Sequence, residues 1–216
     1  MLDVRKPINS FVKLLQHPEG PSASTLRRSA ADELYELPKT ETPYGKIVEQ
    51  TTVLGTKGSL VWDHLNVFAF FHTMASESRQ FFDLMRACAD KAPGRCLSFS
   101  LYTDEVVPRN KLRPDMGGKY QAVYFQVLDF PEYIRSRLPL RWFTFGYVSV
   151  SEMTENDVNV SHLFRVVMRS WFGETWNLKE TGFRLLNGGD VVHVYAKYVC
   201  SPQDERAYKF CFRLQA

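Results

Sequence analysis

The 216-residue sequence lacks the signals that would place it in several large classes of protein. No apolar run approaches the roughly 18 residues needed to span a bilayer, and no apolar segment of a signal peptide follows the basic residues at the start. Its four cysteines, Cys88, Cys96, Cys200 and Cys211, form no Cys-x-x-Cys pair and have no histidines at zinc-ligand spacing. We therefore expect reduced thiols in an intracellular protein, with no membrane partner, no zinc site and no disulfide framework.

The sequence also has little net charge and none of the short motifs of common enzymes. Its formal net charge is +3, too small a basic excess to indicate nucleic-acid binding by itself. It has no Gly-x-Ser-x-Gly elbow and no Walker phosphate loop. A serine hydrolase and a P-loop nucleotidase are therefore not indicated.

What the sequence does contain is typical of a packed globular protein, with 44% hydrophobic and 14% aromatic residues. We divide it into an N-terminal arm and linker at 1–42, a strand plus helical segment at 43–94, and a main domain at 95–216. The arm begins with a short amphipathic pattern at 1–16, which predicts one helix. The division predicts one main core with a helical annex.

The middle segment predicts one strand and two helices. Residues 47–54 are β-branched and partly alternating, which favours a strand. Residues 59–73 are apolar on all sides, which predicts a buried core helix, and Ser76 is placed to cap the next helix. His64 and His72 are eight residues apart and would share a face of the first helix; we interpret them as core or boundary histidines rather than metal ligands.

The main domain opens with the clearest strand of the chain, at 96–108. Leu97, Phe99 and Leu101 alternate with polar or amphipathic residues, the period-two pattern of a strand with one buried face. Asp104 falls on the polar side as this strand ends. The elements expected after it are strands at 120–130 and 141–151, a helix at 160–171, a hairpin with strands at 183–186 and 191–200 around Asn187-Gly188-Gly189, and a helix at 204–214.

This order predicts an α+β fold with a partial ribonuclease-H-like core. Along that fold the chain forms three antiparallel strands, then a helix, a further strand and a second helix. The result is a mixed sheet packed with helices. The fold carries one acid on its first strand and a second at the end of its fourth, and Asp104 and Asp204 occupy these places. Carboxylates there clamp two divalent ions about 4 Å apart for attack on a phosphodiester. Mg²⁺ or Mn²⁺ suits such oxygen ligands.

Two stretches carry a family resemblance. The first is Leu-Tyr-Thr-Asp-Glu-Val-Val-Pro at 101–108 with 119–130 after it, and the second is 182–199 followed by Asp-Glu-Arg-Ala at 204–207. Together they resemble the catalytic core of eukaryotic cut-and-paste transposases of the Kyakuja-Dileera-Zisupton kind and related mobile-element proteins. The resemblance implies metal-dependent DNA strand cleavage and transfer, with Asp104 and Asp204 as catalytic metal ligands. It also implies DNA as partner and an intracellular, nuclear location.

The chain departs from that family pattern in two ways. Asp104 is followed by Glu105 where the family usually has glycine, and the family's cysteine-bearing insertion and third acid do not follow Asp204. A metal site without its third carboxylate is incomplete. We therefore expect a truncated or decayed transposase-like protein that is inactive alone.

Plainer interpretations remain open for each candidate residue. Asp104 also suits the turn after a strand, and Asp204 suits the start of a helix; Glu105 and Asp190 are the next candidate acids. Phosphate contacts could come from the basic connection after the first strand, which contains Arg109, Lys111, Arg113 and Lys119. A second basic group consists of Arg135, Arg137 and Arg141. The alternative function is a non-catalytic α+β module that binds nucleic acid or a protein partner through such basic loops.

Overall fold

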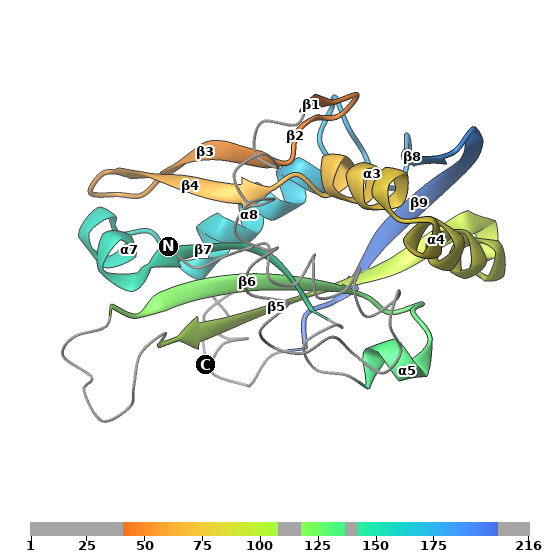
Figure 1. The fold of residues 1–216 in the computed structure, drawn as a ribbon. Coiled ribbons are helices and arrows are strands. Elements are labelled where there is room, and N and C mark those ends of the chain that lie inside the picture. The colour runs from red at the N-terminus through yellow and green to blue at the C-terminus, as the bar shows by residue number, and fades with distance from the viewer. Residues whose placement is uncertain (1–40, 108–117, 137–141, 203–216) are drawn as a thin grey trace, which may run out of the picture.

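The computed structural model describes residues 41–107, 118–136 and 142–202. The helices predicted at 1–16 and 204–214 lie outside these residues, as does most of the basic connection at 109–118. Within the described residues the fold is α+β, as predicted, and is built on one large curled sheet (Figure 1).

Seven strands form this sheet in the order β3-β4-β7-β6-β5-β9-β8. β5 and β9 run parallel, and every other neighbouring pair is antiparallel. The strands are β3 (Val48–Leu54), β4 (Ser59–Leu65), β5 (Cys96–Val106), β6 (Tyr120–Val127), β7 (Phe143–Ser149), β8 (Phe183–Asn187) and β9 (Asp190–Cys200). A separate two-stranded sheet pairs β1 (Glu41–Thr42) with β2 (Gly45–Lys46).

Five α-helices accompany the sheet in the described residues. They are α3 (Val67–Glu77), α4 (Arg79–Lys91), α5 (Glu132–Arg135), α7 (Val150–Asn156) and α8 (Val160–Trp171), with a short 3₁₀ turn, η2 (Pro93–Arg95), after α4. Phe71 of α3 and Trp171 of α8 both contact the rings of Phe99 on β5 and Phe125 on β6. Helices α3 and α8 therefore cover the same face of the central strands, and this aromatic layer is the core.

Most of the predicted elements are confirmed. Strand β3 lies at 48–54, and β5, β6 and β7 are consecutive antiparallel neighbours. Helix α8 has the predicted bounds, and β8 and β9 form a hairpin across Asn187, Gly188, Gly189 and Asp190. Gly188 and Gly189 both have positive φ, the conformation for which the turn was predicted.

The predicted core helix at 59–73 is wrong in its first half. Residues 59–65 form β4, in which Leu60 and Trp62 are buried while Val61 and Asp63 are exposed. The period is two rather than 3.6, and the short apolar run hid that difference. His64 therefore lies on a strand and His72 on helix α3, so the two histidines do not share a helix face.

The start of α4 and the end of β7 also differ from prediction. Ser78, not Ser76, caps α4: its hydroxyl accepts a hydrogen bond from the Phe81 amide at 3.2 Å. The hydroxyl of Ser76 instead donates to the Thr73 carbonyl, 2.8 Å away, at the end of α3. β7 ends at Ser149, and the chain turns directly into α7, a helix that the sequence pattern did not indicate.

The sheet has a narrow junction between β4 and β7. These strands share a single residue pair, His64 with Gly146, whereas β3 and β4 pair along their whole length. A side chain at Gly146 would meet the Asp63 carbonyl at 2.9 Å and the Trp62 ring at 3.0 Å, so glycine is required for this approach. The His64 imidazole stacks on the Phe145 ring, with the centroids 5.2 Å apart. Ring packing therefore supports the junction where backbone pairing is minimal.

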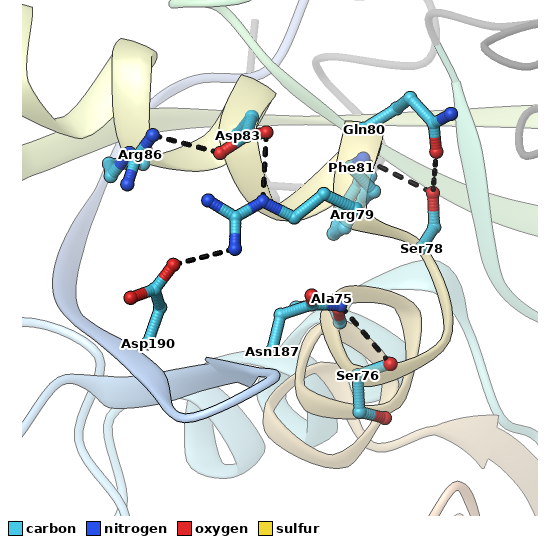
Figure 2. Close-up of polar contacts among 10 residues, drawn as sticks. All are labelled: Ala75, Ser76, Ser78, Arg79, Gln80, Phe81, Asp83, Arg86, Asn187 and Asp190. Carbon is cyan, nitrogen blue, oxygen red and sulfur yellow. Dashed lines mark hydrogen bonds and ion pairs between the residues drawn. The ribbon is translucent and has the colours of Figure 1, made fainter.

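At the opposite edge, the β8–β9 turn is fastened to the junction of α3 and α4 (Figure 2). The Asn187 side-chain amide donates to the carbonyls of Ala75 and Ser76 at 2.7 and 3.2 Å, which satisfies the end of α3. Asp190 accepts from the Arg79 guanidinium at 2.6 Å, and Arg79 also bonds to Asp83 within α4. These contacts fix the hairpin and hence the position of β9 beside β5.

Candidate functional site

The first predicted acid lies at the far end of the central strand. Asp104 is exposed near the end of β5, paired with Ala122 of β6. Since side chains alternate along a strand, Asp104 shares a face with Ser98, Ser100 and Tyr102, opposite to the face that packs on α3 and α8. The carboxylate is therefore on the side of the sheet away from the aromatic core.

Aromatic side chains border Asp104 on this face. The ring of Tyr102 stacks on that of Tyr124, its partner on β6, with centroids 6.2 Å apart, and lies 5.4 Å from the Trp142 ring. Burial raises the pKa of the Tyr124 phenol, and the nearby charge of Asp104 raises it further. The phenol therefore stays protonated at neutral pH and can act as a hydrogen-bond donor close to the carboxylate.

Glu105 points to the other side of the strand. Its carboxylate forms an ion pair of 2.7 Å with the Lys119 ammonium across the base of the β5–β6 connection. Both side chains are exposed, so the pair contributes little stability. Of the four basic residues predicted at this connection, Lys119 is the one that the structure describes, and its charge is already matched by Glu105.

Strand β9 stops short of Asp104 on its other side. The parallel register pairs Phe99 with Tyr198 and Ser100 with Cys200, with one extra residue of β9 between these pairs. In the described part of the chain, β5 beyond Ser100 is paired only with β6. Asp104 therefore lies on a strand segment whose β9 side is not filled by described residues.

The remaining candidate residues fall into two groups. Asp204, Arg109, Lys111 and Arg113 lie outside the described residues, as do Arg137 and Arg141. Asp190 begins β9 at the opposite end of the sheet from Asp104, bonded to Arg79. Arg135 forms an ion pair with Glu132 one turn away on α5. Of the acids considered, Asp104 is the one that the described structure places exposed at a strand end on the face away from the helices.

The described residues do not complete a metal site. No group of three histidine, cysteine, aspartate or glutamate side chains among them is placed to hold an ion. Asp104 offers one carboxylate, and Glu105 is turned away. Likewise, none of the described helices is long and apolar enough to cross a membrane.

The structure also groups residues that the sequence analysis did not select. Arg184 of β8 and His193, Tyr195 and Lys197 of β9 lie on the face of the hairpin that points away from the core, as their alternation with buried Val192, Val194 and Ala196 requires. In the sequence, the signal for this group was the set of side chains at the odd-numbered positions of 191–199, which alternate with the apolar residues of the strand. It was overlooked because only the apolar half of the pattern was used to predict the strand.

Comparison with known proteins adds no relative. A scan against protein-family models found no match, and neither did searches of curated proteins and of solved structures.

Proposed function

We propose that this chain is a transposase-like protein with a ribonuclease-H-like core, descended from enzymes that cleave and transfer DNA strands with divalent metal ions. The observation that carries the proposal is the exposed carboxylate of Asp104 near the end of the central strand, on a segment that β9 does not pair with among the described residues. An acid on the first strand of a three-stranded antiparallel unit is the position that the family resemblance predicts.

The strand order supports the same proposal. Along the chain, the antiparallel strands β5, β6 and β7 are followed by α7 and α8, then by β8, and then by β9, which is parallel to β5. With β8 counted as an additional strand, the spatial order β7-β6-β5-β9 is the one expected for the first four strands of a ribonuclease-H-like sheet. The β3–β4 hairpin and the antiparallel β8 extend the sheet at its two edges.

In this proposal Asp104 is one ligand of Mg²⁺ or Mn²⁺, and Asp204 is the second. When bound, such ions activate a water or hydroxyl and stabilise the leaving oxygen at a phosphodiester. The contribution of the chain's own residues is an acidic group near the end of β5 and, beside it, a protonated Tyr124 phenol able to donate to a phosphate oxygen. Since no group of three metal-ligating side chains is found among the described residues, we propose that the chain alone is inactive or weakly active.

The proposal is tested by metal titration and DNA nicking on matched variants. Calorimetric titration with Mn²⁺ would compare the wild type, Asp104→Asn and Asp204→Asn with the control Glu105→Gln, which removes the neighbouring carboxylate on the opposite face. We expect metal binding to be lost in both aspartate variants and kept in the control. Nicking of supercoiled DNA, if any, should follow the same pattern.

The competing function is a non-catalytic module that binds nucleic acid or a protein partner through basic loops. This function predicts that the wild type binds no more metal than Asp104→Asn does. It also predicts that DNA affinity falls when Arg109, Lys111 and Arg113 are changed to alanine. A wild type that binds no metal would refute the metal-site proposal for this chain and leave this second function. The ion pair of Lys119 with Glu105 makes Lys119 a weaker candidate for phosphate contact.

A further inference from the structure

The outward face of the β8–β9 hairpin combines basic and aromatic side chains without an acid. The inward face is formed by the buried Leu185, Val192, Val194 and Ala196. The outward face carries Arg184, Leu186, Val191, His193, Tyr195 and Lys197. Since a typical soluble sheet face mixes both charges, this one-sided composition suggests an anionic ligand.

The two basic residues of this face are available to a ligand. Arg184 and Lys197 are exposed, and neither takes part in an ion pair within the described chain. Asp190, at the turn, is engaged by Arg79, so its charge is already matched (Figure 2). The backbone of Arg184 is held on both sides, because its amide donates to the Tyr44 hydroxyl at 2.6 Å and its carbonyl lies 3.1 Å from the His72 ring nitrogen.

Between the two basic residues lies a fixed pair of aromatic rings. The rings of His193 and Tyr195 are stacked, with centroids 4.8 Å apart and planes inclined by 17°. The His193 ring is held by the Thr181 carbonyl, 2.7 Å from Nε2. Gly182, with φ of +60°, leaves room for the pair: a side chain there would come within 2.8 Å of His193 and 2.9 Å of Tyr195. Both rings remain partly exposed. The stacked pair, which we call the aromatic platform, is therefore present without a ligand and accessible to one.

From this arrangement we infer that the outward face of the β8–β9 hairpin binds a single DNA strand, with phosphates at Arg184 and Lys197 and a base on Tyr195. Nucleic-acid grooves without sequence preference combine these two elements, basic side chains for the backbone and aromatic rings for the bases. Arg184 is paired with His193, so the two basic residues are separated by about 13 Å of strand with the ring pair between them.

The inference deepens the proposed function and rests on it for the choice of DNA. Lys197 is paired with Ser98, six residues before Asp104 on the same face of β5. The hairpin face therefore lies roughly 20 Å along the strand direction from the candidate catalytic acid. The hairpin face would therefore hold the DNA strand at a position separate from the site of cleavage.

The test measures binding of a fluorescently labelled single-stranded oligonucleotide of about 20 nucleotides by anisotropy, in EDTA and at several salt concentrations. Arg184→Ala/Lys197→Ala is compared with Arg165→Ala/Arg169→Ala, which removes the same charge from exposed positions on α8. For the hairpin variant we expect the slope of log affinity against log salt to fall in magnitude by about 1.4, equivalent to about 25-fold for a tenfold change of salt. The α8 variant should match the wild type.

A second pair of variants tests the aromatic platform. Tyr195→Leu should weaken binding by about 5- to 150-fold, and Tyr195→Phe, which keeps the ring, should bind as the wild type does. Thermal unfolding of each variant checks that the sheet is intact. Equal affinity of the hairpin and α8 variants, or of Tyr195→Leu and the wild type, would overturn the inference.

The use of EDTA separates this inference from the proposed function. Asp104→Asn should bind the oligonucleotide as the wild type does, because no metal takes part. If Asp104→Asn loses metal binding but still binds the oligonucleotide, the result bears on the metal site of the proposed function and leaves the hairpin site intact. A chain whose Asp104 binds metal, but whose hairpin variants bind DNA normally, would keep the proposed function and refute the hairpin site.

Discussion

Replacement of Asn66 by alanine should be among the most damaging single changes in this fold. The side chain is 3% exposed and makes three hydrogen bonds that join separate parts of the chain. Its oxygen accepts from the Ala69 amide at 3.1 Å, which caps α3, and its nitrogen donates to the Tyr44 carbonyl and the Glu49 carboxylate, both at 2.7 Å.

The expected cost follows from these bonds. Loss of a helix cap costs about 1 kcal/mol, loss of the bond to a neutral carbonyl about 1 kcal/mol, and loss of the bond to a carboxylate about 1.5–3 kcal/mol. The free energy of unfolding should therefore fall by about 3.5–5 kcal/mol, a large part of the roughly 5–15 kcal/mol typical of a domain. Urea unfolding followed by circular dichroism measures it.

The variant Asn66→Asp separates the cap from the two donated bonds. It keeps the acceptor for the Ala69 amide but places a carboxylate against the Tyr44 carbonyl and the Glu49 carboxylate. The pKa of the new group should be raised in the folded state, so its stability relative to Asn66→Ala should improve as pH falls through the carboxyl range. Gln50→Ala, which removes an exposed bond to Asp63 on the same hairpin, is the control and should cost under about 1 kcal/mol.

A fall of less than about 1 kcal/mol in Asn66→Ala would refute this reasoning. It would mean that water or a neighbouring donor replaces the amide at little cost. An Asn66→Asp variant whose stability relative to Asn66→Ala is independent of pH would show that the two acceptors do not face the side chain as described.

Three further predictions concern separate parts of the fold. Burial raises the pKa of the Cys88 thiol to about 11, so at pH 8 it should react with iodoacetamide far more slowly than the exposed Cys200, as peptide mass spectrometry would show; equal rates would contradict the burial. Burial lowers the pKa of His64 below its ordinary 6.5, so as pH falls the unfolded chain binds a proton before the folded chain does. The free energy of unfolding should therefore fall as pH drops below about 7. This part of the pH dependence should vanish in His64→Gln. Gly55→Ala would place Cβ 1.9 Å from the Asn156 carbonyl oxygen and should cost about 1–3 kcal/mol in urea unfolding, and an unchanged midpoint would show that the two loops are not packed together.

The sequence predicted the sheet well where alternation was long and unambiguous. Strand β5 is eleven residues long and alternates clearly from Leu97 to Tyr102, and the β8–β9 turn was marked by residues that tolerate positive φ. Helix α8 was equally clear, because its buried residues recur at helical spacing between a capping asparagine and the end at Trp171. These signals are local and need no knowledge of the remaining chain.

The errors lie where burial removes periodicity. Every residue from His64 to Phe71 is buried, because β4 is followed after one residue by the central helix α3. The alternation that marks β4 covers only the few residues before this buried run, and it includes the apolar but exposed Val61, so the strand looks like the start of the helix in sequence. The boundary is fixed by Asn66, whose amide and side chain bond to residues about twenty positions earlier, and such contacts cannot be seen in a single sequence.

The candidate site was predictable only in part. Asp104 was placed correctly at an exposed strand end, because its strand pattern was clear. The pairing of Lys119 with Glu105 and the rings of Tyr124 and Trp142 near Tyr102 depend on the register between strands, which loop length and composition do not determine. The metal-binding role of Asp104 and Asp204 stays a prediction.

The single residue pair between β4 and β7 gives the sheet a weak line. On one side lies the β3–β4 hairpin, and on the other lies the five-stranded part that carries Asp104 and the β8–β9 face. Because few backbone hydrogen bonds cross this line, the two parts should differ in native-state amide exchange, with β3 and β4 opening at a lower free energy than β5 and β6.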